Sequence, residues 1–255
     1  MMFPKEFKIL ESHGWQYVRD LKTVKLPALF RGRPEISSDI TPEDAVELED
    51  LCPAGAIASV PEFSLDMGKC LFCKECQFRK PGIVNFTSDY KIATVDRNAL
   101  RIKAGKTNPV DFHSELVGKE IGKLFGRALN LRQVSAGGDN SCEMELNACG
   151  NVNFDMGRFG IEFQASPRHC DGMAVTGPVS KNMAEALKLC YEAIPAPKIL
   201  ILAGTEAISG GLFASSNAVD RSFLDSLHVD LYVPGNPAHP LTFINGVLNL
   251  ISNSK

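Results

Sequence analysis

The sequence predicts an α/β protein in two parts, in which a doubly wound parallel sheet over residues 111–255 follows a small α+β module over residues 1–110. From about residue 114 onward, apolar strand-like runs alternate with helical stretches, as in a parallel sheet covered by helices. Before residue 110 the elements are short and separated by prolines and polar turns, and four of the eight cysteines fall between residues 52 and 76. We place a domain boundary near residues 103–109.

Five strands and several helices are expected in the second part. The strands are expected at residues 129–134, 160–164, 172–176, 198–203 and 229–233. A helix over residues 182–193 shows apolar residues at helical spacing, and a last helix is expected from about 240 to 251. Doubly wound sheets place their sites at the carboxyl ends of the strands. The loops at 136–142, 204–211 and 234–240 should therefore converge at one edge of the sheet.

The composition excludes several classes of protein. A chain of 255 residues with 44% hydrophobic content can bury a core without cross-links. Its net charge of -3 gives no field that would attract nucleic acid or an anionic membrane surface. Because the N-terminal residues do not resemble a secretory leader and the apolar runs are strand-sized, we expect a cytoplasmic chain without a membrane span. Cysteines in such a chain are expected to be ligands or buried thiols rather than disulfides.

The cysteine spacing predicts a metal centre in the first part. Cys70-Leu-Phe-Cys73-Lys-Glu-Cys76 has the two-residue spacing with which three thiolates bind three corners of one 4Fe-4S cluster. The expected fourth ligand is Cys52, because ferredoxin-type modules use a distant cysteine followed by proline, here Pro53. Zinc bound by the same thiolates, or ordinary thiols, is the alternative interpretation. The Cys-Pro context favours the cluster.

This region resembles the inner portion of a bacterial two-cluster ferredoxin, in which Cys-Pro-x-Gly-Ala-Ile, here residues 52–57, precedes a Cys-x2-Cys-x2-Cys run. In that family the cysteine before proline in each motif serves the cluster of the other motif. Ferredoxin spacing puts the ligands of the second cluster at Pro42, Ala45, Leu48 and Lys80, and none of these is cysteine. The resemblance therefore implies one remaining 4Fe-4S cluster, held by Cys52, Cys70, Cys73 and Cys76.

The segment from Asp139 to Lys255 resembles the small subunit of group 4 nickel-iron hydrogenases, which is also the cluster-bearing small subunit of respiratory complex I. The matching stretches are Asp139-Asn-Ser-Cys-Glu-Met-Glu145, Phe154 to Ile161, Ser166 to His169, Thr176 to Val179, Ser209 to Gly211 and Tyr232 to Pro237. Phe30-Arg-Gly-Arg-Pro-Glu35, ahead of the cysteines, resembles the separate ferredoxin-like subunit of the same complexes. The chain thus resembles a fusion of a ferredoxin-like domain with a flavodoxin-like domain.

The second part also departs from that family. The family binds a proximal 4Fe-4S cluster with four cysteines, and the matching positions here are Asp139, Cys142, Glu206 and Asn236. One thiolate with Asp, Glu and Asn is a poor ligand set for a soft cluster and a better set for a hard cation or for no metal. Cys149, Cys170 and Cys190 are expected to be core residues. Arg168 and His169 match positions that face the large subunit in the family.

The resemblance implies outer-sphere electron transfer through one 4Fe-4S cluster inside a hydrogenase-like or complex I-like oxidoreductase complex. The implied partners are a hydrogenase-large-subunit-like protein and membrane subunits, which would hold the chain at the inner face of the cell membrane. No nucleophile, general acid or substrate pocket is evident, so no catalytic centre is expected in this chain. The alternative is a non-catalytic docking subunit with a structural cluster, which the loss of proximal ligands favours. A stand-alone nucleotide-binding protein is disfavoured because residues 204–211 do not fit Gly-x-Gly-x-x-Gly.

Overall fold

A five-stranded parallel sheet forms the centre of the second part of the chain. The computed structural model describes residues 4–14, 17–126 and 128–252. The strands of this sheet are β6 (Leu129–Ser135), β7 (Ile161–Phe163), β8 (Gly172–Thr176), β9 (Ile199–Ala203) and β10 (Leu231–Val233). Every residue of β8 and β9 is buried, as expected for strands covered on both faces. The five predicted strands are confirmed, and β7 and β10 are shorter than expected because each is an edge strand with one neighbour.

The strand order identifies the fold. Neighbouring strands follow the order β10-β9-β8-β6-β7, and all four pairings are parallel. Counted from β6 as the first strand, this is the 2-1-3-4-5 order of the flavodoxin-like doubly wound sheet. The predicted fold class is therefore confirmed. The order reverses between β6 and β8, where ligand sites of such sheets are commonly found.

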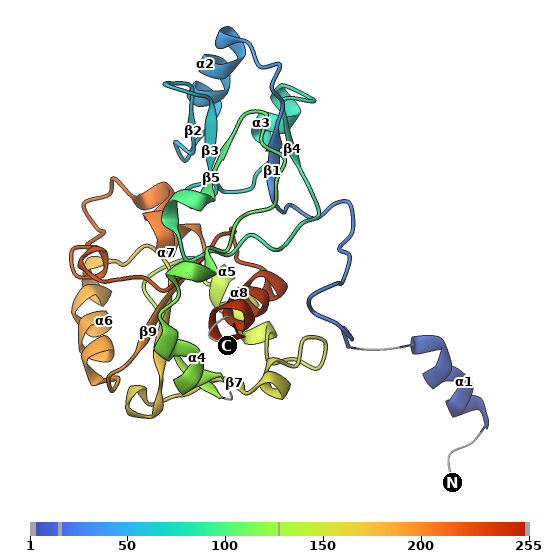
Figure 1. Ribbon diagram of the computed structural model, residues 1–255, viewed down its shortest axis with the longest axis vertical. Helices are drawn as coiled ribbons and strands as arrows, with labels where there is room; N and C mark the ends of the chain where they lie inside the picture. The colour runs from blue at the N-terminus through green and yellow to red at the C-terminus, as the bar shows by residue number, and fades with distance from the viewer. Residues whose placement is uncertain (1–3, 15–16, 127, 253–255) are drawn as a thin grey trace.

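Helices cover both faces of this sheet (Figure 1). They are α4 (Lys119–Phe125), α5 (Ser141–Ala148), α6 (Lys181–Ala193), α7 (Thr205–Ser209) and α8 (Pro240–Ser252). Leu187 of α6 belongs to the same buried cluster as Met173 of β8, whereas Phe243 of α8 belongs to the cluster that contains the next strand residue, Ala174. Successive residues of β8 thus point to opposite faces of the sheet. The two predicted helices correspond to α6 and α8.

The first part contains two small antiparallel sheets. β1 (Pro34–Ile36) pairs with β4 (Val84–Phe86), and β3 (Ser64–Asp66) lies between β2 (Ile57–Ala58) and β5 (Arg101–Lys103). The helices are α1 (Pro4–His13), α2 (Pro42–Leu51) and α3 (Glu75–Arg79), and α1 stands apart from the other elements in Figure 1. Short 3-10 helices lie in the connections at Arg97–Leu100, Ser114–Leu116, Met156–Phe159, Pro167–His169, Gly211–Phe213 and Leu224–Ser226.

The two parts share a core and are joined by backbone contacts. Leu48 of α2 and Leu65 of β3 lie in the same buried cluster as Val175 of β8. Thr94 and Tyr232 form an isolated antiparallel bridge, with N···O distances of 3.1 and 2.9 Å between their backbones. Buried side chains from both parts pack in one cluster, so the two parts are coupled. The boundary at residues 103–109 stays a prediction.

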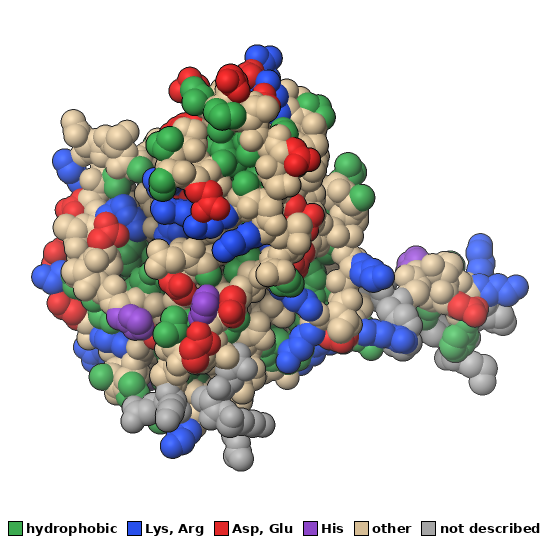
Figure 2. Space-filling model, turned by 45° about the horizontal axis from the view of Figure 1, so that its top comes forward, with side chains coloured by type: hydrophobic (Ala, Val, Ile, Leu, Met, Phe, Trp, Pro, Cys, Tyr) green, Lys and Arg blue, Asp and Glu red, His purple; other side chains and the backbone are tan. Residues whose placement is uncertain are grey.

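Charges of both signs are interspersed over the surface shown in Figure 2. This mixture agrees with the small net charge of -3. Among the residues that the structure describes, every helix is too short or too polar to cross a bilayer.

Candidate metal centre

The four cysteines of the first part line one cavity. Cys52 caps the end of α2, Cys70 and Cys73 lie in the loop between β3 and α3, and Cys76 lies on α3. The cavity between them is small, about 20 Å³, and apolar residues such as Leu48 complete the wall. Cys70 and Cys76 are buried, while Cys52 and Cys73 are partly exposed. The tertiary structure thus brings the two cysteine segments of the sequence to one place.

The backbone of the cysteine loop directs donors toward sulfur. Phe72 and Lys74 have φ angles of 53° and 69°, a left-handed conformation that costs a non-glycine residue roughly 1–2 kcal/mol. The Phe72 N–H donates a hydrogen bond to Cys70 Sγ at 3.2 Å, and the Ala56 N–H donates to Cys52 Sγ at 3.3 Å. Hydrogen bonds of this kind stabilise negative charge on the sulfur ligands of a metal centre.

Burial controls the protonation of these thiols. Burial raises the pKa of the Cys70 thiol, and burial together with the neighbouring Cys73 raises the pKa of Cys76 to about 11. Both thiols are therefore protonated at neutral pH unless a metal displaces the proton. Because the thiolate is the ligand, metal loading must release protons and should become more favourable as the pH rises.

The donor set limits the kind of centre that this cavity can hold. Four sulfur donors with an apolar wall suit a soft centre such as an iron-sulfur cluster or zinc, and they do not suit calcium or magnesium. Within residues 4–14, 17–126 and 128–252, no three His, Cys, Asp or Glu side chains form a group that could hold a single metal ion. The sulfurs are instead distributed around a cavity. The chemistry of the four sulfur donors fits a thiolate-bound soft centre.

The positions expected to bind a second ferredoxin cluster lie on α2 or form an ion pair with it. Three of the four positions lie on or at the start of α2, namely Pro42, Ala45 and Leu48. The helix is capped by Thr41, whose hydroxyl oxygen accepts a hydrogen bond from the Asp44 N–H at 3.1 Å. The fourth position, Lys80, forms an ion pair with Asp44 at 2.7 Å. Apolar side chains and an ammonium group offer no ligand to a metal.

The second candidate site lies at the carboxyl edge of the parallel sheet. Asp139 and Cys142 follow β6, Glu206 follows β9 and Asn236 follows β10. A Cβ added to Gly138 would lie 2.6 Å from Glu206 Oε2, and one added to Gly204 would collide with Cys142 Sγ. The loops after β6 and β9 therefore converge, as the fold predicts. Asn236 lies in the following turn and lines a separate cavity with Glu145.

The electrostatics at this edge differ from those of the cysteine cavity. Burial and the negative charges of Asp139 and Glu143 raise the pKa of Glu206. Hydrogen bonds from the Ser141 hydroxyl and backbone N–H, at 2.6 and 2.9 Å, lower the pKa of Asp139. Burial raises the pKa of Cys142 to about 12. One thiol among carboxylate and amide oxygens is a poor ligand set for a 4Fe-4S cluster, which is held by thiolates.

One buried hydroxyl connects the two candidate sites. Thr205 Oγ1 lies 2.8 Å from the Cys70 carbonyl oxygen and 3.2 Å from the Gly235 carbonyl oxygen, and it can donate its proton to either. Thr205 immediately precedes Glu206, and Gly235 immediately precedes Asn236. The cysteine loop therefore lies directly against the strand-end site. Sequence reasoning missed Thr205, whose only signal is a threonine at the start of a helix beside a predicted site residue.

Other residues singled out in the sequence are the remaining cysteines and the pair Arg168 and His169. Cys149 and Cys170 are buried with exposed fractions of 0% and 4%, and Cys190 is half-buried against the same core as α6. Arg168 and His169 are exposed beside the start of β8. Sequence reasoning also missed Glu143, whose carboxylate accepts hydrogen bonds from the hydroxyls of Ser135 and Thr176, both at 2.7 Å.

The strand order and the sites at the strand ends define the second part as a flavodoxin-like α/β domain. A profile of the family described as NADH ubiquinone oxidoreductase, 20 kDa subunit, matches residues 140–250. The chain is 36% identical over 129 residues to a probable membrane-bound hydrogenase subunit, mbhJ, of Pyrococcus furiosus, and the match covers 51% of this chain and 77% of that protein. The chain belongs to the NADH ubiquinone oxidoreductase 20 kDa subunit family.

Further similarities cover about half of the chain. A subunit of the NADH-quinone oxidoreductase of Desulfovibrio desulfuricans is 40% identical over 126 residues, which are 49% of this chain and 68% of that protein. A chain in the structure of the membrane-bound sulfane sulfur reductase, an archaeal respiratory membrane complex, has a TM-score of 0.46 and 23% identity, over 52% of this chain and 74% of that chain. The cysteine cavity lies outside residues 140–250, the range of the family match.

Proposed function

We propose that this chain is the iron-sulfur electron-transfer subunit of a membrane-associated hydrogenase-like or complex I-like oxidoreductase complex. It carries one 4Fe-4S cluster on Cys52, Cys70, Cys73 and Cys76. The observation that carries the proposal is the single cavity lined by all four cysteines. Relatives named as subunits of a membrane-bound hydrogenase and of an NADH-quinone oxidoreductase support the assignment to such a complex.

A 4Fe-4S cluster supplies one-electron transfer when it is bound. The residues of the chain hold it and adjust its potential. Backbone N–H groups at Phe72 and Ala56 donate to two sulfurs and favour their negative charge. Burial of Cys70 and Cys76 restricts access of water, while the positive charges of the nearby Lys69 and Lys74 favour the reduced state.

The two parts act as a fusion of neighbouring subunits in this proposal. Residues 1–110 form the ferredoxin-like domain, and residues 111–255 form the domain that resembles the hydrogenase small subunit. A large-subunit-like protein docks on the strand-end edge, and membrane subunits hold the complex at the inner face of the cell membrane. The contact of Thr205 with the Cys70 carbonyl oxygen keeps the cluster beside that edge.

The strand-end site of the second part holds no proximal cluster in this proposal. Asp139, Glu206 and Asn236 replace three of the four thiolates of the family, and the remaining thiol, Cys142, is buried with its pKa raised to about 12. Carboxylate and amide oxygens are hard ligands that match iron-sulfide poorly. The chain therefore carries one cluster.

A second candidate function is a docking subunit whose cluster is structural. The same replacement of three thiolates favours it, because the cluster of the first part then has no second cluster to which it can pass an electron. The two functions differ in one observable property. An electron carrier shows a reversible reduction that is coupled to turnover of the complex, whereas a structural cluster stays in one oxidation state during turnover.

Iron and sulfide analysis tests the proposal. The chain purified without oxygen should contain about four iron and four sulfide, as one complete set of thiolate ligands requires. Cys73→Ser should lose most of the iron and should also lose stability around residues 40–100, since a small metal-bound module depends on its metal for folding. Cys190→Ser is the matched control, because Cys190 lies outside the cavity. Zinc in place of iron, or about eight irons per chain, contradicts the proposal.

A further inference from the structure

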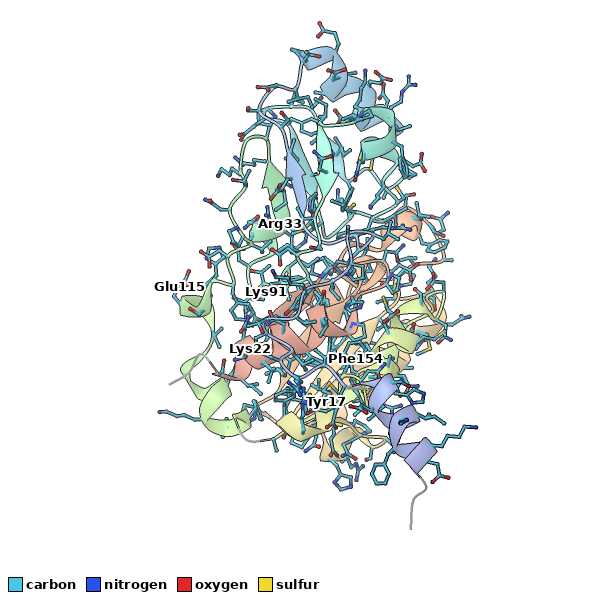
Figure 3. All side chains as sticks on the ribbon, turned by 90° about the vertical axis from the view of Figure 1, so that its right-hand side faces the viewer. Tyr17, Lys22, Arg33, Lys91, Glu115 and Phe154 are labelled. Carbon is cyan, nitrogen blue, oxygen red and sulfur yellow. The ribbon has the colours of Figure 1, made fainter. Side chains whose placement is uncertain are left out.

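A third cavity lies on the side of the molecule where Figure 3 labels its lining residues Lys22, Arg33 and Lys91. Its volume is about 650 Å³, and it is open to solvent. The walls come from the N-terminal segment 22–25, from β1, from the loop 87–91 after β4, and from α8. It shares no lining residue with the cysteine cavity or with the strand-end site. The proposed function therefore makes no use of it.

Arg33 is buried in the wall of this cavity with hydrogen-bond donors left over. Its side chain is 7% exposed, and its Nη2 lies 2.6 Å from Glu35 Oε1. Its Nε lies 3.5 Å from Asp89 Oδ2, which is an ion pair but too long for a good hydrogen bond. Nε and Nη1 are both buried without a hydrogen-bond partner. A buried donor without an acceptor is unfavourable, so Nη1 favours an acceptor that the chain itself does not supply.

The rim of the cavity adds positive charge. Lys22, Lys25 and Lys91 are exposed lining residues, and Figure 3 shows Lys22 and Lys91 on the same side as Arg33. The carboxylates that line the cavity are those of Glu35 and Asp89, so four cationic side chains face two anionic ones. Asp20 adds a third carboxylate beside Lys22 and Lys91. The balance remains positive.

The segments that carry these lysines are fixed in place. The Tyr90 hydroxyl donates to the Leu21 carbonyl oxygen at 2.6 Å and ties the N-terminal segment to the loop after β4. The Lys91 N–H donates to Asp89 Oδ1 at 2.9 Å. From α8, Asn245 contributes a buried amide to the cavity wall. A backbone held in this way reduces the conformational freedom that the site must lose when a ligand binds.

We propose that this cavity binds the phosphate group of a small soluble molecule. Arg33 Nη1 is the buried donor, and Lys22, Lys25 and Lys91 surround the oxygens of the phosphate. A phosphate offers more acceptor oxygens and more charge than a carboxylate, and guanidinium and ammonium groups are its usual partners. A lipid headgroup shares this chemistry, and vesicle binding distinguishes the two sources.

The test measures binding of inorganic phosphate to the full metal-loaded chain by isothermal titration calorimetry at low salt. We expect binding that weakens as salt is added, because the rim charges are exposed. The double substitution Lys22→Ala/Lys91→Ala should weaken binding about tenfold or more, since two charged contacts are lost. Lys106→Ala, which removes an exposed lysine outside the cavity, should bind like the original chain. Arg33→Lys should also weaken binding, because a lysine cannot reproduce the Nη1 donor.

Several outcomes would overturn the proposal. One is an absence of phosphate binding, which would mean that water alone satisfies Arg33. Another is equal affinity in the original chain and in the lysine double variant, which does not depend on how Arg33→Lys folds. Vesicles of phosphatidylglycerol, with phosphatidylcholine vesicles as the control, form the second arm. Binding to those vesicles without binding of inorganic phosphate would assign the site to a lipid headgroup and exclude a soluble ligand.

Discussion

Burial raises the pKa of thiols in both candidate sites. The side chains around each thiol distinguish the two sites. Cys76, with its pKa raised to about 11, has three cysteines as neighbours in the same cavity. Cys142, with its pKa raised to about 12, has the carboxylates of Glu143, Glu206 and Asp139 near it. Four thiolates can share the charge of a soft metal centre, whereas carboxylates beside one thiol oppose its deprotonation. At the scale of single residues, the donor set distinguishes the two sites.

Restoring the missing thiols should restore a cluster. The triple substitution Asp139→Cys, Glu206→Cys and Asn236→Cys, made together, places four cysteines at the strand ends with Cys142. We expect iron content to rise by about four per chain, because a complete thiolate set then exists. Iron and sulfide analysis after reconstitution measures this. In the original chain, Cys142→Ser should leave the iron content unchanged. No gain of iron in the triple variant would show that the loops have moved away from the family geometry.

His239 should make the protein less stable in acid. Burial lowers the pKa of His239 from 6.5 to about 4, and its ring packs against Phe30 and Phe154 at centroid distances of 5.1 and 6.0 Å. Between these two pKa values the unfolded chain binds a proton that the folded chain does not, so stability is complete above pH 6.5 and falls as the pH drops toward 4. The loss should be about 2 kcal/mol, less than the full shift because the side chain is partly exposed.

Urea unfolding at pH 7 and at pH 5 measures this dependence. His239→Gln, which cannot take up the proton, should show a smaller loss of unfolding free energy between the two pH values than the original chain. His13→Gln is the control, since His13 is exposed on α1. An equal loss in the original chain and in His239→Gln would rule out His239 as the cause of the acid sensitivity.

At the scale of elements, α2 occupies the segment where the resemblance places three ligand positions of a second ferredoxin cluster. The helix starts with the Thr41 cap, buries Ala45 and Leu48, and ends at Cys52, a proposed ligand. Ion pairs from Lys80 to Asp44 and Glu47, both at 2.7 Å, join it to the end of α3, which carries Cys76. A helix and ion pairs thus connect the two segments that hold the cavity.

Removing the cap of α2 should affect both stability and metal retention. Thr41→Ala loses the hydrogen bond from the Asp44 N–H at 3.1 Å and should lower the free energy of unfolding by about 1 kcal/mol. Because Cys52 lies at the other end of the same helix, iron should also be lost faster to a chelator. Thr107→Ala, in an exposed loop, is the control. Unchanged chelation kinetics with lowered stability would mean that α2 is not coupled to the metal site.

At the scale of the whole molecule, the strand-end edge has the character of a docking surface. Met144 on α5 and Leu212 and Phe213 after α7 are 66%, 53% and 48% exposed. Gly210 and Gly211, with φ angles of 88° and 57°, keep a turn there that other residues adopt poorly. Exposed apolar side chains beside a fixed turn favour a protein partner.

Isolation of the chain from native membranes tests the partner. We expect a large-subunit-like protein and membrane subunits to copurify with the tagged chain. Arg168→Glu should weaken this association severalfold in the proposed complex, because Arg168 is exposed at a position where the proposal docks the large-subunit-like protein. Arg101→Glu, an exposed charge reversal in the first part, is the control. Recovery of a stable monomer without such partners would refute membership of a complex.

The sequence by itself determined the α/β class, the positions of the five strands of the parallel sheet and the residues to be considered as ligands. Local apolar runs and cysteine spacing depend on neighbours along the chain, so they can be read without coordinates. The Cys-Pro context already indicated Cys52 as the partner of Cys70, Cys73 and Cys76, and the structure places all four at one cavity. The tertiary structure alone decided that Thr205 links this cavity to the strand-end site. It also decided that Arg33 is buried with an unused donor. Burial and long-range contact depend on how distant segments pack, and no local pattern specifies that packing.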